Sequence, residues 1–238
     1  ASDLPGNGTS GDPYEISNVS ELQAMEDDLD ANYVLVSDID ASDTAEFNDG
    51  RGFDPVGADP FVEDNKAFTG SLDGNNNTIT GLTIDRSNES RVGLIGFSFG
   101  TVRHITLTTA TITGNNTVGG VVGEHRGTLT DVTISGSVTG DRNVGGLVGD
   151  NFDGTIRNAS ASGSVTGDRN VGGIIGSHSE FSEATLADSS ASGSVTGDRS
   201  VGGVVGTNSA NITNATASGS VTATGTDEPG RAQAGGIV

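Results

Sequence analysis

The thirteen residues Ser137–Gly149, SVTGDRNVGGLVG, decide the fold because the chain repeats them. The pattern returns at Ser164–Gly176 and Ser194–Gly206, and a looser copy spans Thr111–Gly123. Its Val-Gly pair recurs in steps of 26, 26, 27 and 30 residues, at Val92, Val118, Val144, Val171 and Val201. A period of this length indicates a repeat architecture rather than one globular core.

Two further strand-like segments keep their own register within each period. In the first, apolar or small residues occupy positions n, n+3 and n+5, in the sets Ile79/Leu82/Ile84, Val102/Ile105/Leu107, Leu129/Val132/Ile134, Ile156/Ala159/Ala161, Leu186/Ser189/Ala191 and Ile212/Ala215/Ala217. The second carries one apolar residue, namely Ile112, Val138, Val165, Val195 or Val221. Such a unit cannot bury its apolar side alone, so successive copies must stack.

The sequence therefore predicts an all-β protein, a parallel β-solenoid with three short strands per rung of about 26 residues. We expect the right-handed winding that parallel crossovers usually take. Six to seven rungs would fill residues 66–238, the last of them incomplete.

Residues 1–65 are expected to form an N-terminal cap. Residues 20–30 read as a short helix, with Ser20 as the N-cap and with Leu22, Met25 and Leu29 on one face. Such a cap would cover the open sheet edge of the first rung, which could otherwise pair with another chain.

The composition excludes several classes of function. The net charge is −21, from 32 acidic residues against 11 Lys and Arg residues, so nucleic acid and anionic membrane surfaces are unfavourable partners. The absence of Cys excludes disulfide scaffolds, zinc–thiolate sites and thiol nucleophiles. No apolar run approaches the roughly 20 residues of a membrane span. An acidic composition with a single Lys is similar to that of proteins from extreme halophiles.

The Val-Gly-Gly-Leu-Val-Gly core, followed by a turn and an Ile-x-Asn-Ala/Ser-x-Ala-x-Gly strand, resembles the GLUG motif of bacterial and archaeal surface proteins. The segments at residues 11–17, 22–25 and 33–40 resemble the cap that precedes such repeats, and residues 68–75 resemble the usual entry to the first rung. The resemblance implies a surface-exposed, adhesin-like setting and brings no shared catalytic residues.

Several motifs suggest chemistry but lack its context. Residues 6–11 fit Gly-x-Gly-x-x-Gly without the preceding strand of a dinucleotide site, and residues 96–100 fit Gly-x-Ser-x-Gly at a turn of the repeat. His125 and His178 fall on turns two rungs apart and are expected to be solvated. Asp38, Asp40, Asp43, Asp49 and Asp54 could offer oxygen ligands to Ca²⁺, but they lack the spacing of an EF-hand loop. We therefore expect no cofactor and no metal site.

Eight Asn-x-Ser/Thr sequons are candidate glycosylation sites. They are Asn7, Asn18, Asn76, Asn88, Asn115, Asn158, Asn211 and Asn214. Their density favours an exported, extracellular or cell-surface protein.

Two ladders are expected along the rod. Asp141, Arg142, Asp168, Arg169, Asp198 and Arg199 stack at one corner, where Asp and Arg of neighbouring rungs could pair and hold the register. The second ladder is a column of aliphatic side chains. It is expected because neighbouring residues of a straight strand point to opposite faces. One aliphatic column of the repeat core, Val122, Val148, Ile175 and Val205, would then face outward unless a glycine bends the chain. We expect this column to be an association stripe.

The sequence thus predicts a non-catalytic extracellular structural protein, a stiff rod used as a cell-surface filament subunit, adhesin or spacer. Its expected partner is a second copy or a neighbouring surface protein, with glycans as a further candidate. The alternative is a carbohydrate-binding or carbohydrate-cleaving module such as a viral fibre or spike. A cleft lined by Asp or Glu, with aromatic residues from the insertions at 47–66, 177–183 and 223–233, would favour that alternative.

Overall fold

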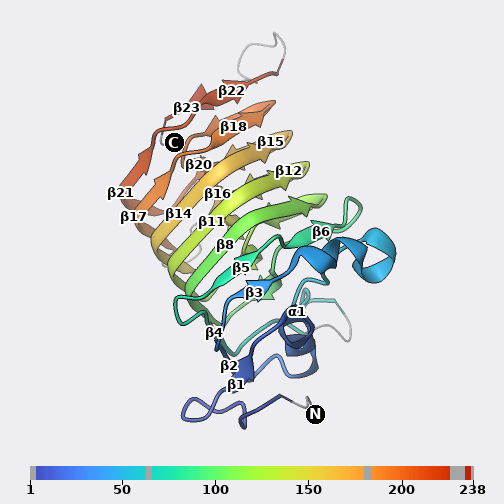
Figure 1. Ribbon diagram of the computed structural model, residues 1–238. Helices are drawn as coiled ribbons and strands as arrows, with labels where there is room; N and C mark the ends of the chain where they lie inside the picture. Colours follow the sequence, from blue (N-terminus) through green and yellow to red (C-terminus); the bar gives the residue numbers. More distant parts are fainter. Residues whose placement is uncertain (1–3, 63–65, 180–183, 226–233, 237–238) are drawn as a thin grey trace.

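The computed structural model describes residues 4–62, 66–179, 184–225 and 234–236. They form an all-β parallel solenoid of about six turns, as the sequence predicts (Figure 1). The N-terminal cap lies at one end, with the helix α1 (Val19–Gln23) and the 3-10 helices η1 (Ala24–Asp27) and η2 (Ser42–Gly50). Parts of the three expected insertions lie outside the described residues, namely 63–65, 180–183 and 226–233. Residues 237–238 of the expected last rung also lie outside them.

Three parallel sheets run the length of the rod. The long sheet contains β1 (Tyr14–Ile16), β2 (Asn32–Leu35), β3 (Ile39–Asp40), β4 (Ser71–Asp73), β5 (Thr78–Thr80), β6 (Thr83–Asp85), β8 (Thr101–Thr113), β11 (Thr128–Thr139), β14 (Thr155–Thr166), β17 (Thr185–Ala191), β18 (Ser194–Gly197), β21 (Asn211–Ala217) and β22 (Val221–Ala223). The second sheet contains β7 (Ile95–Ser98), β10 (Val122–His125), β13 (Val148–Asn151), β16 (Ile175–His178) and β20 (Val205–Asn208). The third contains β9 (Asn116–Gly119), β12 (Arg142–Gly145), β15 (Arg169–Gly172), β19 (Arg199–Gly202) and β23 (Ala234–Gly235).

The strands of each rung begin and end at other positions of the repeat than the sequence predicts. The segments predicted as the second and third strands are continuous in β8, β11 and β14, whereas the Val-Gly-Gly-Leu-Val-Gly core splits into two strands at a bend over Gly146 and Leu147.

The n, n+3, n+5 spacing comes from one left-handed residue in each rung. Asp131 has φ +54° between Leu129 and Val132, and the equivalent Asn158 has φ +50°. A single left-handed residue interrupts the strand alternation, so residues three apart both face the core. Asn and Asp adopt this conformation more readily than other non-glycine residues.

The expected association stripe is wrong. Val122, Val148, Ile175 and Val205 are fully buried, and so is Leu147 beside Val148. The bend at Gly146 places Leu147 and Val148 on the two arms of a corner, so both point inward. They belong to one hydrophobic cluster that extends from Leu4 to Ala215.

Glycines let the second and third sheets approach backbone to backbone. A Cβ added at Gly145 would lie 2.0 Å from the carbonyl oxygen of Val148 and 2.7 Å from the amide nitrogen of Gly176 in the next rung. A Cβ at Gly149 would lie 2.5 Å from the amide nitrogen of Val118 in the preceding rung. The glycines of the repeat therefore serve close packing between sheets.

The helix expected in the cap is present, but it begins earlier in the sequence than predicted. Asn18, rather than Ser20, is the N-cap of α1, and its Oδ1 accepts a bond from the Glu21 amide at 3.0 Å. Leu22 and Met25 are fully buried, as the amphipathic pattern predicts. Strands β1 and β2 of the cap stack in register with β4, so the long sheet continues across residue 65.

Candidate functional site

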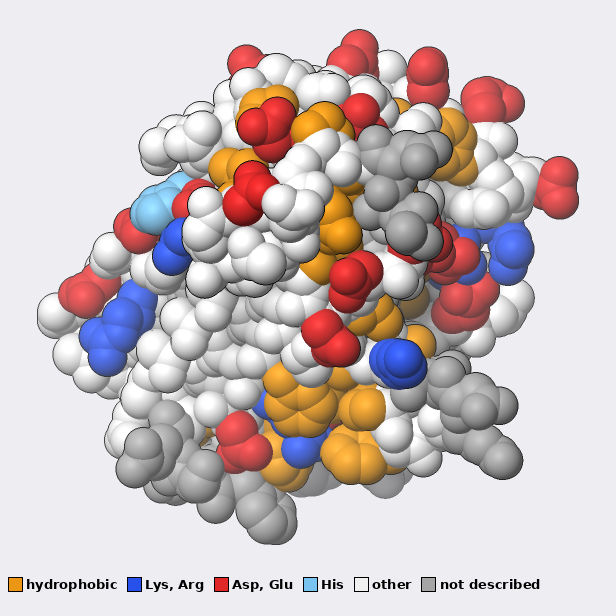
Figure 2. All heavy atoms as spheres, turned by 90° about the horizontal axis from the view of Figure 1, so that it is seen from below, with side chains coloured by type: hydrophobic (Ala, Val, Ile, Leu, Met, Phe, Trp, Pro, Cys, Tyr) orange, Lys and Arg blue, Asp and Glu red, His pale blue; other side chains and the backbone are white. Residues whose placement is uncertain are grey.

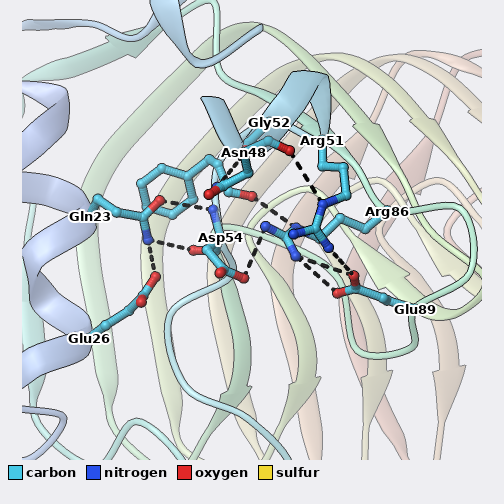
Figure 3. Close-up of polar contacts among 9 residues, drawn as sticks. Gln23, Glu26, Asn48, Arg51, Gly52, Asp54, Arg86 and Glu89 are labelled. Atoms are coloured by element: carbon cyan, nitrogen blue, oxygen red, sulfur yellow. Dashed lines mark hydrogen bonds and ion pairs between the residues drawn. The ribbon is translucent and has the colours of Figure 1, made fainter. Parts of the chain in front are cut away.

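A polar cluster lies in the cap, where α1, η1, η2 and the turn after β6 meet (Figure 3). The Gln23 side chain holds the main chain of Asp54 from both sides. Its Nε2 donates to the Asp54 carbonyl oxygen and its Oε1 accepts from the Asp54 amide, each at 2.9 Å. Gln23 Nε2 also donates to the Glu26 carboxylate, so one side-chain amide joins Glu26 to the main chain of Asp54.

Arg86 fixes the other side of this cluster from a buried position. Its side chain is only 3% exposed. The guanidinium group lies 3.1 Å from an Asp54 carboxylate oxygen, donates to Glu89 at 3.2 Å, and donates to the Phe53 carbonyl oxygen at 3.3 Å (Figure 3).

Sequence reasoning did not find this cluster, although one signal was present. Arg86 follows Asp85, which pairs with Thr113, so Arg86 occupies the place of Gly114 in the next rung. Later rungs also have glycine there, at Gly140 and Gly167. A charged residue at a position where the other rungs have glycine indicates that this rung makes contacts that the other rungs do not make.

Glu26 has a shifted pKa in this cluster. Partial burial, and then the charge of Asp54, raise the pKa of the Glu26 carboxyl group to about 7. Near neutral pH this group therefore exchanges between a hydrogen-bond donor and an acceptor.

Arg86→Met is expected to lower the free energy of unfolding by about 2–3 kcal/mol, because it leaves the carboxylates of Asp54 and Glu89 without their buried cation. Arg51→Met is the matched control, since Arg51 contacts the same Glu89 at 3.4 Å but is 59% exposed, and it should cost less than about 0.5 kcal/mol. Urea denaturation in molar salt measures both. Equal losses would contradict this role of Arg86.

A second cluster joins aromatic rings and arginines beside the second sheet. The Arg126 guanidinium lies 4.2 Å from the Phe152 ring centroid, 5.3 Å from Phe61 and 5.4 Å from Phe97. Glu124 binds Arg126 at 2.9 Å and Arg91 at 2.8 Å. Asp59 binds Arg91 as well, at 3.0 Å, so two carboxylates balance the two arginine charges. Cation–π contacts of this kind stabilise the turn.

Seen from the cap end, acidic side chains are spread over the surface with few basic ones among them (Figure 2). The expected charge ladder is not an ion-pair ladder. Arg142, Arg169 and Arg199 stack on one another, and none of the six residues makes an ion pair with any described residue. Backbone bonds hold this corner instead, as in the bond of 2.9 Å from the Asp168 amide to the Asp141 carbonyl oxygen.

The expectation of solvated turn histidines is wrong. His125 and His178 are 0% and 1% exposed, because each is the last residue of its strand and points into the corner. They stack with Asn151 between them. Asn151 lies 3.1 Å from His178 Nδ1, whereas neither ring nitrogen of His125 makes a hydrogen bond of normal geometry.

Acidification is expected to destabilise the protein through His125. Burial lowers the pKa of its imidazole to about 4, against an ordinary value of 6.5. Between these values the folded state binds fewer protons than the unfolded state, so the free energy of unfolding falls as the pH falls. The expected loss is on the order of 3 kcal/mol.

His125→Asn, which copies the next rung, should remove the contribution of His125 to this dependence. His178, whose pKa burial also lowers, keeps its contribution in both proteins. Burial and then the Glu124 charge raise the pKa of Asp150 to about 6, and this works in the opposite direction in both proteins. The difference between the two proteins therefore isolates His125. Urea denaturation near neutral pH and at about pH 4.5 measures it, and an identical pH dependence would contradict the assignment.

The eight sequons differ in their surroundings. Asn115 is half-buried, and the other seven are exposed. Asn76, Asn88 and Asn211 make no side-chain hydrogen bond to a described residue. The remaining candidates are bonded: Asn7 to Asp12, Asn18 to Glu21, Asn115 to Asp141, Asn158 to Asp131 and Asn214 to Asp188. Glycan attachment at these positions stays a prediction.

The other chemical motifs do not assemble into sites. Within the described ranges no group of three or more His, Asp or Glu residues could hold a metal ion. The carboxylates of Asp38 and Asp40 accept bonds from the amides of Thr78 and Ser42 instead. Ser98 is fully buried, and its Oγ accepts a bond from the Gly100 amide at 3.1 Å.

Comparison with a family model identifies the repeat. The GLUG motif matches residues 140–166 and 197–222. Each match spans one rung of the structure, the first running through β12 and β13 to the end of β14. Both segments carry the GLUG motif. The resemblance expected from the sequence is therefore confirmed.

Two relatives each match about half of the chain. Halomucin of Haloquadratum walsbyi is 45% identical over 121 residues, which are 48% of this chain and 1% of halomucin. A "putative Gly-rich membrane protein" of Evansella cellulosilytica is 34% identical over 113 residues, 45% of this chain and 12% of that protein. The chain thus matches only a small part of either relative. The first source is a halophilic archaeon, in agreement with the acidic, lysine-poor composition.

A solved structure shares the fold. The crystal structure of a "putative immunoglobulin A1 protease" from Bacteroides ovatus has a TM-score of 0.64 and 19% identity, covering 98% of this chain and 85% of that chain. At this identity the likeness shows the fold alone. Among the described residues, no helix has the length and apolar composition that a membrane span requires.

Proposed function

We propose that this chain is a non-catalytic structural segment of a longer extracellular protein, in which the solenoid serves as a stiff spacer at the cell surface. The observation that carries this proposal is the register of the rungs. β11 and β14 pair through eleven residues without a shift, and the second and third sheets continue the same pairing along the rod. Bending such a rod must strain its backbone hydrogen bonds and its continuous core.

The comparisons support the surface setting. The relative from Evansella is named a membrane protein, and the part of halomucin that this chain matches is 1% of a far longer protein. A solenoid within a long chain can separate the segments before and after it by a fixed distance.

The spacer is favoured over the filament subunit because the aliphatic column expected to mediate association is interior. A neighbouring surface protein remains a predicted partner. Self-association, the other partner expected from the sequence, would have to use a different surface and would count against the spacer. Adhesion would require a ligand site in addition to the rod.

Antibody labelling tests the proposed setting. An antibody raised against the folded chain should label intact source cells, and external protease should remove the label without lysing the cells. Labelling that appears only after lysis would contradict an extracellular role. A cytoplasmic protein followed in the same samples is the control for intact cells.

A further inference from the structure

An open cleft crosses the N-terminal cap. Two hollows of about 370 Å³ and 270 Å³ share Glu26 and Asp54 in their linings. The larger continues past Leu29, Pro55, Ala58 and Lys66, and the smaller past Gln23, Phe47 and Asn48. The two hollows adjoin at these carboxylates, and we refer to them together as the trough. Their size suits a small-molecule ligand.

The walls of this trough are held in place without a ligand. Gln23 fixes the Asp54 main chain through two bonds of 2.9 Å, and buried Arg86 fixes the Asp54 carboxylate at 3.1 Å (Figure 3). A site built this way loses little conformational entropy on binding. The glycine-to-arginine change that places Arg86 here occurs in the rung next to the cap, whereas later rungs have Gly114, Gly140 and Gly167 at this position.

The lining excludes ions as the ligand. Two carboxylates disfavour an anion, Lys66 at the rim disfavours a metal cation, and the described residues hold no metal-binding group of three acids or histidines. What remains is a mixture of carboxyl and amide groups over apolar atoms of Leu29, Pro55 and Phe47. A sugar ring presents the complementary pattern, with hydroxyl groups at its edge and C–H groups on its faces.

We propose that the cap cleft binds a neutral saccharide, whose hydroxyl groups bond Glu26 and Asp54 and whose ring faces pack on Leu29, Pro55 and Phe47. Glu26 can accept or donate near neutral pH, which suits hydroxyl groups in either orientation. The inference is independent of the spacer proposal, since a rod can carry such a site whatever its mechanical role.

Saturation-transfer difference NMR in molar salt tests the cleft with a defined panel of maltotriose, cellotriose, mannotriose and chitotriose. At least one member should give a saturation-transfer signal with the wild-type chain. Ala58→Trp fills the larger hollow from an exposed position, and Glu26→Ala removes a central bonding group. Each should reduce the signal at least about tenfold, whereas Glu26→Gln, which keeps hydrogen-bonding capacity, should retain most of it.

Ser209→Trp is the matched control, because it adds the same side chain at an exposed turn after β20, at the other end of the rod. It should bind like the wild type. Circular dichroism and urea denaturation confirm that each variant is folded. No signal from any panel member would overturn the proposal, and so would a signal that survives Ala58→Trp.

Discussion

Gly145→Ala is expected to lower the free energy of unfolding by about 3 kcal/mol or more, because the new methyl group meets main chain on two sides. The Cβ would lie 2.0 Å from the Val148 carbonyl oxygen of its own rung and 2.7 Å from the Gly176 amide nitrogen of the next. Neither atom can move without opening the contact between the second and third sheets. Urea denaturation followed by circular dichroism in molar salt measures the change.

Gly11→Ala supplies the control for this prediction. A Cβ at Gly11 would meet no atom within 4 Å, so the same chemical change should alter stability by less than about 0.5 kcal/mol. Similar losses in the two variants would contradict the packing role of Gly145, because backbone entropy alone makes Gly→Ala stabilising at a compatible position.

Val148→Asp is expected to abolish folding. Val148 is fully buried, and an unpaired carboxylate at this corner costs about 3–5 kcal/mol in addition to the lost apolar contacts. A loss of this size is comparable to the whole stability of a typical domain. The variant should lack the β-sheet circular dichroism of the wild type at every salt concentration tested.

Thr139→Asp is the comparison for Val148→Asp. Thr139 is exposed at the end of β11, so its replacement adds the same charge without burying it, and the protein should fold normally. A Val148→Asp variant that folds but associates differently would instead support the prediction that Val148 belongs to an outward-facing association stripe.

The strongest periodic signals predicted the architecture. The returning Val-Gly pair and the n, n+3, n+5 sets fix the rung length and the core residues, since stacking identical units requires identical positions to face inward. The structure confirms both, from Val102, Leu129 and Ile156 in one column to Val118, Val144 and Val171 in another.

The errors arose where a single residue redirects the chain. A straight-strand interpretation of Leu147 and Val148 put one of them outside, whereas the bend at Gly146 puts both inside. Asp131 and Asn158 are residue types that tolerate a left-handed conformation. The sequence alone does not show that this conformation turns the following side chain toward the core.

The cap cluster could not be derived from the repeat. It joins Gln23, Asp54 and Arg86, which lie far apart in the sequence and follow no period. Burial of His125 and His178 was missed for a related reason, because a residue at a strand end can point inward as readily as outward. The sequence pattern predicts the residue positions that recur in every rung, whereas the candidate site is built from residues that do not recur.

Electron microscopy of the purified protein in molar salt, with light scattering on the same sample, tests the spacer account most directly. The account predicts single elongated particles with the scattering mass of one chain, because the aliphatic column of Val122, Val148, Ile175 and Val205 is interior and the exposed surface is acidic. Ordered fibres, or regular oligomers joined along the sides of the rods, would contradict it.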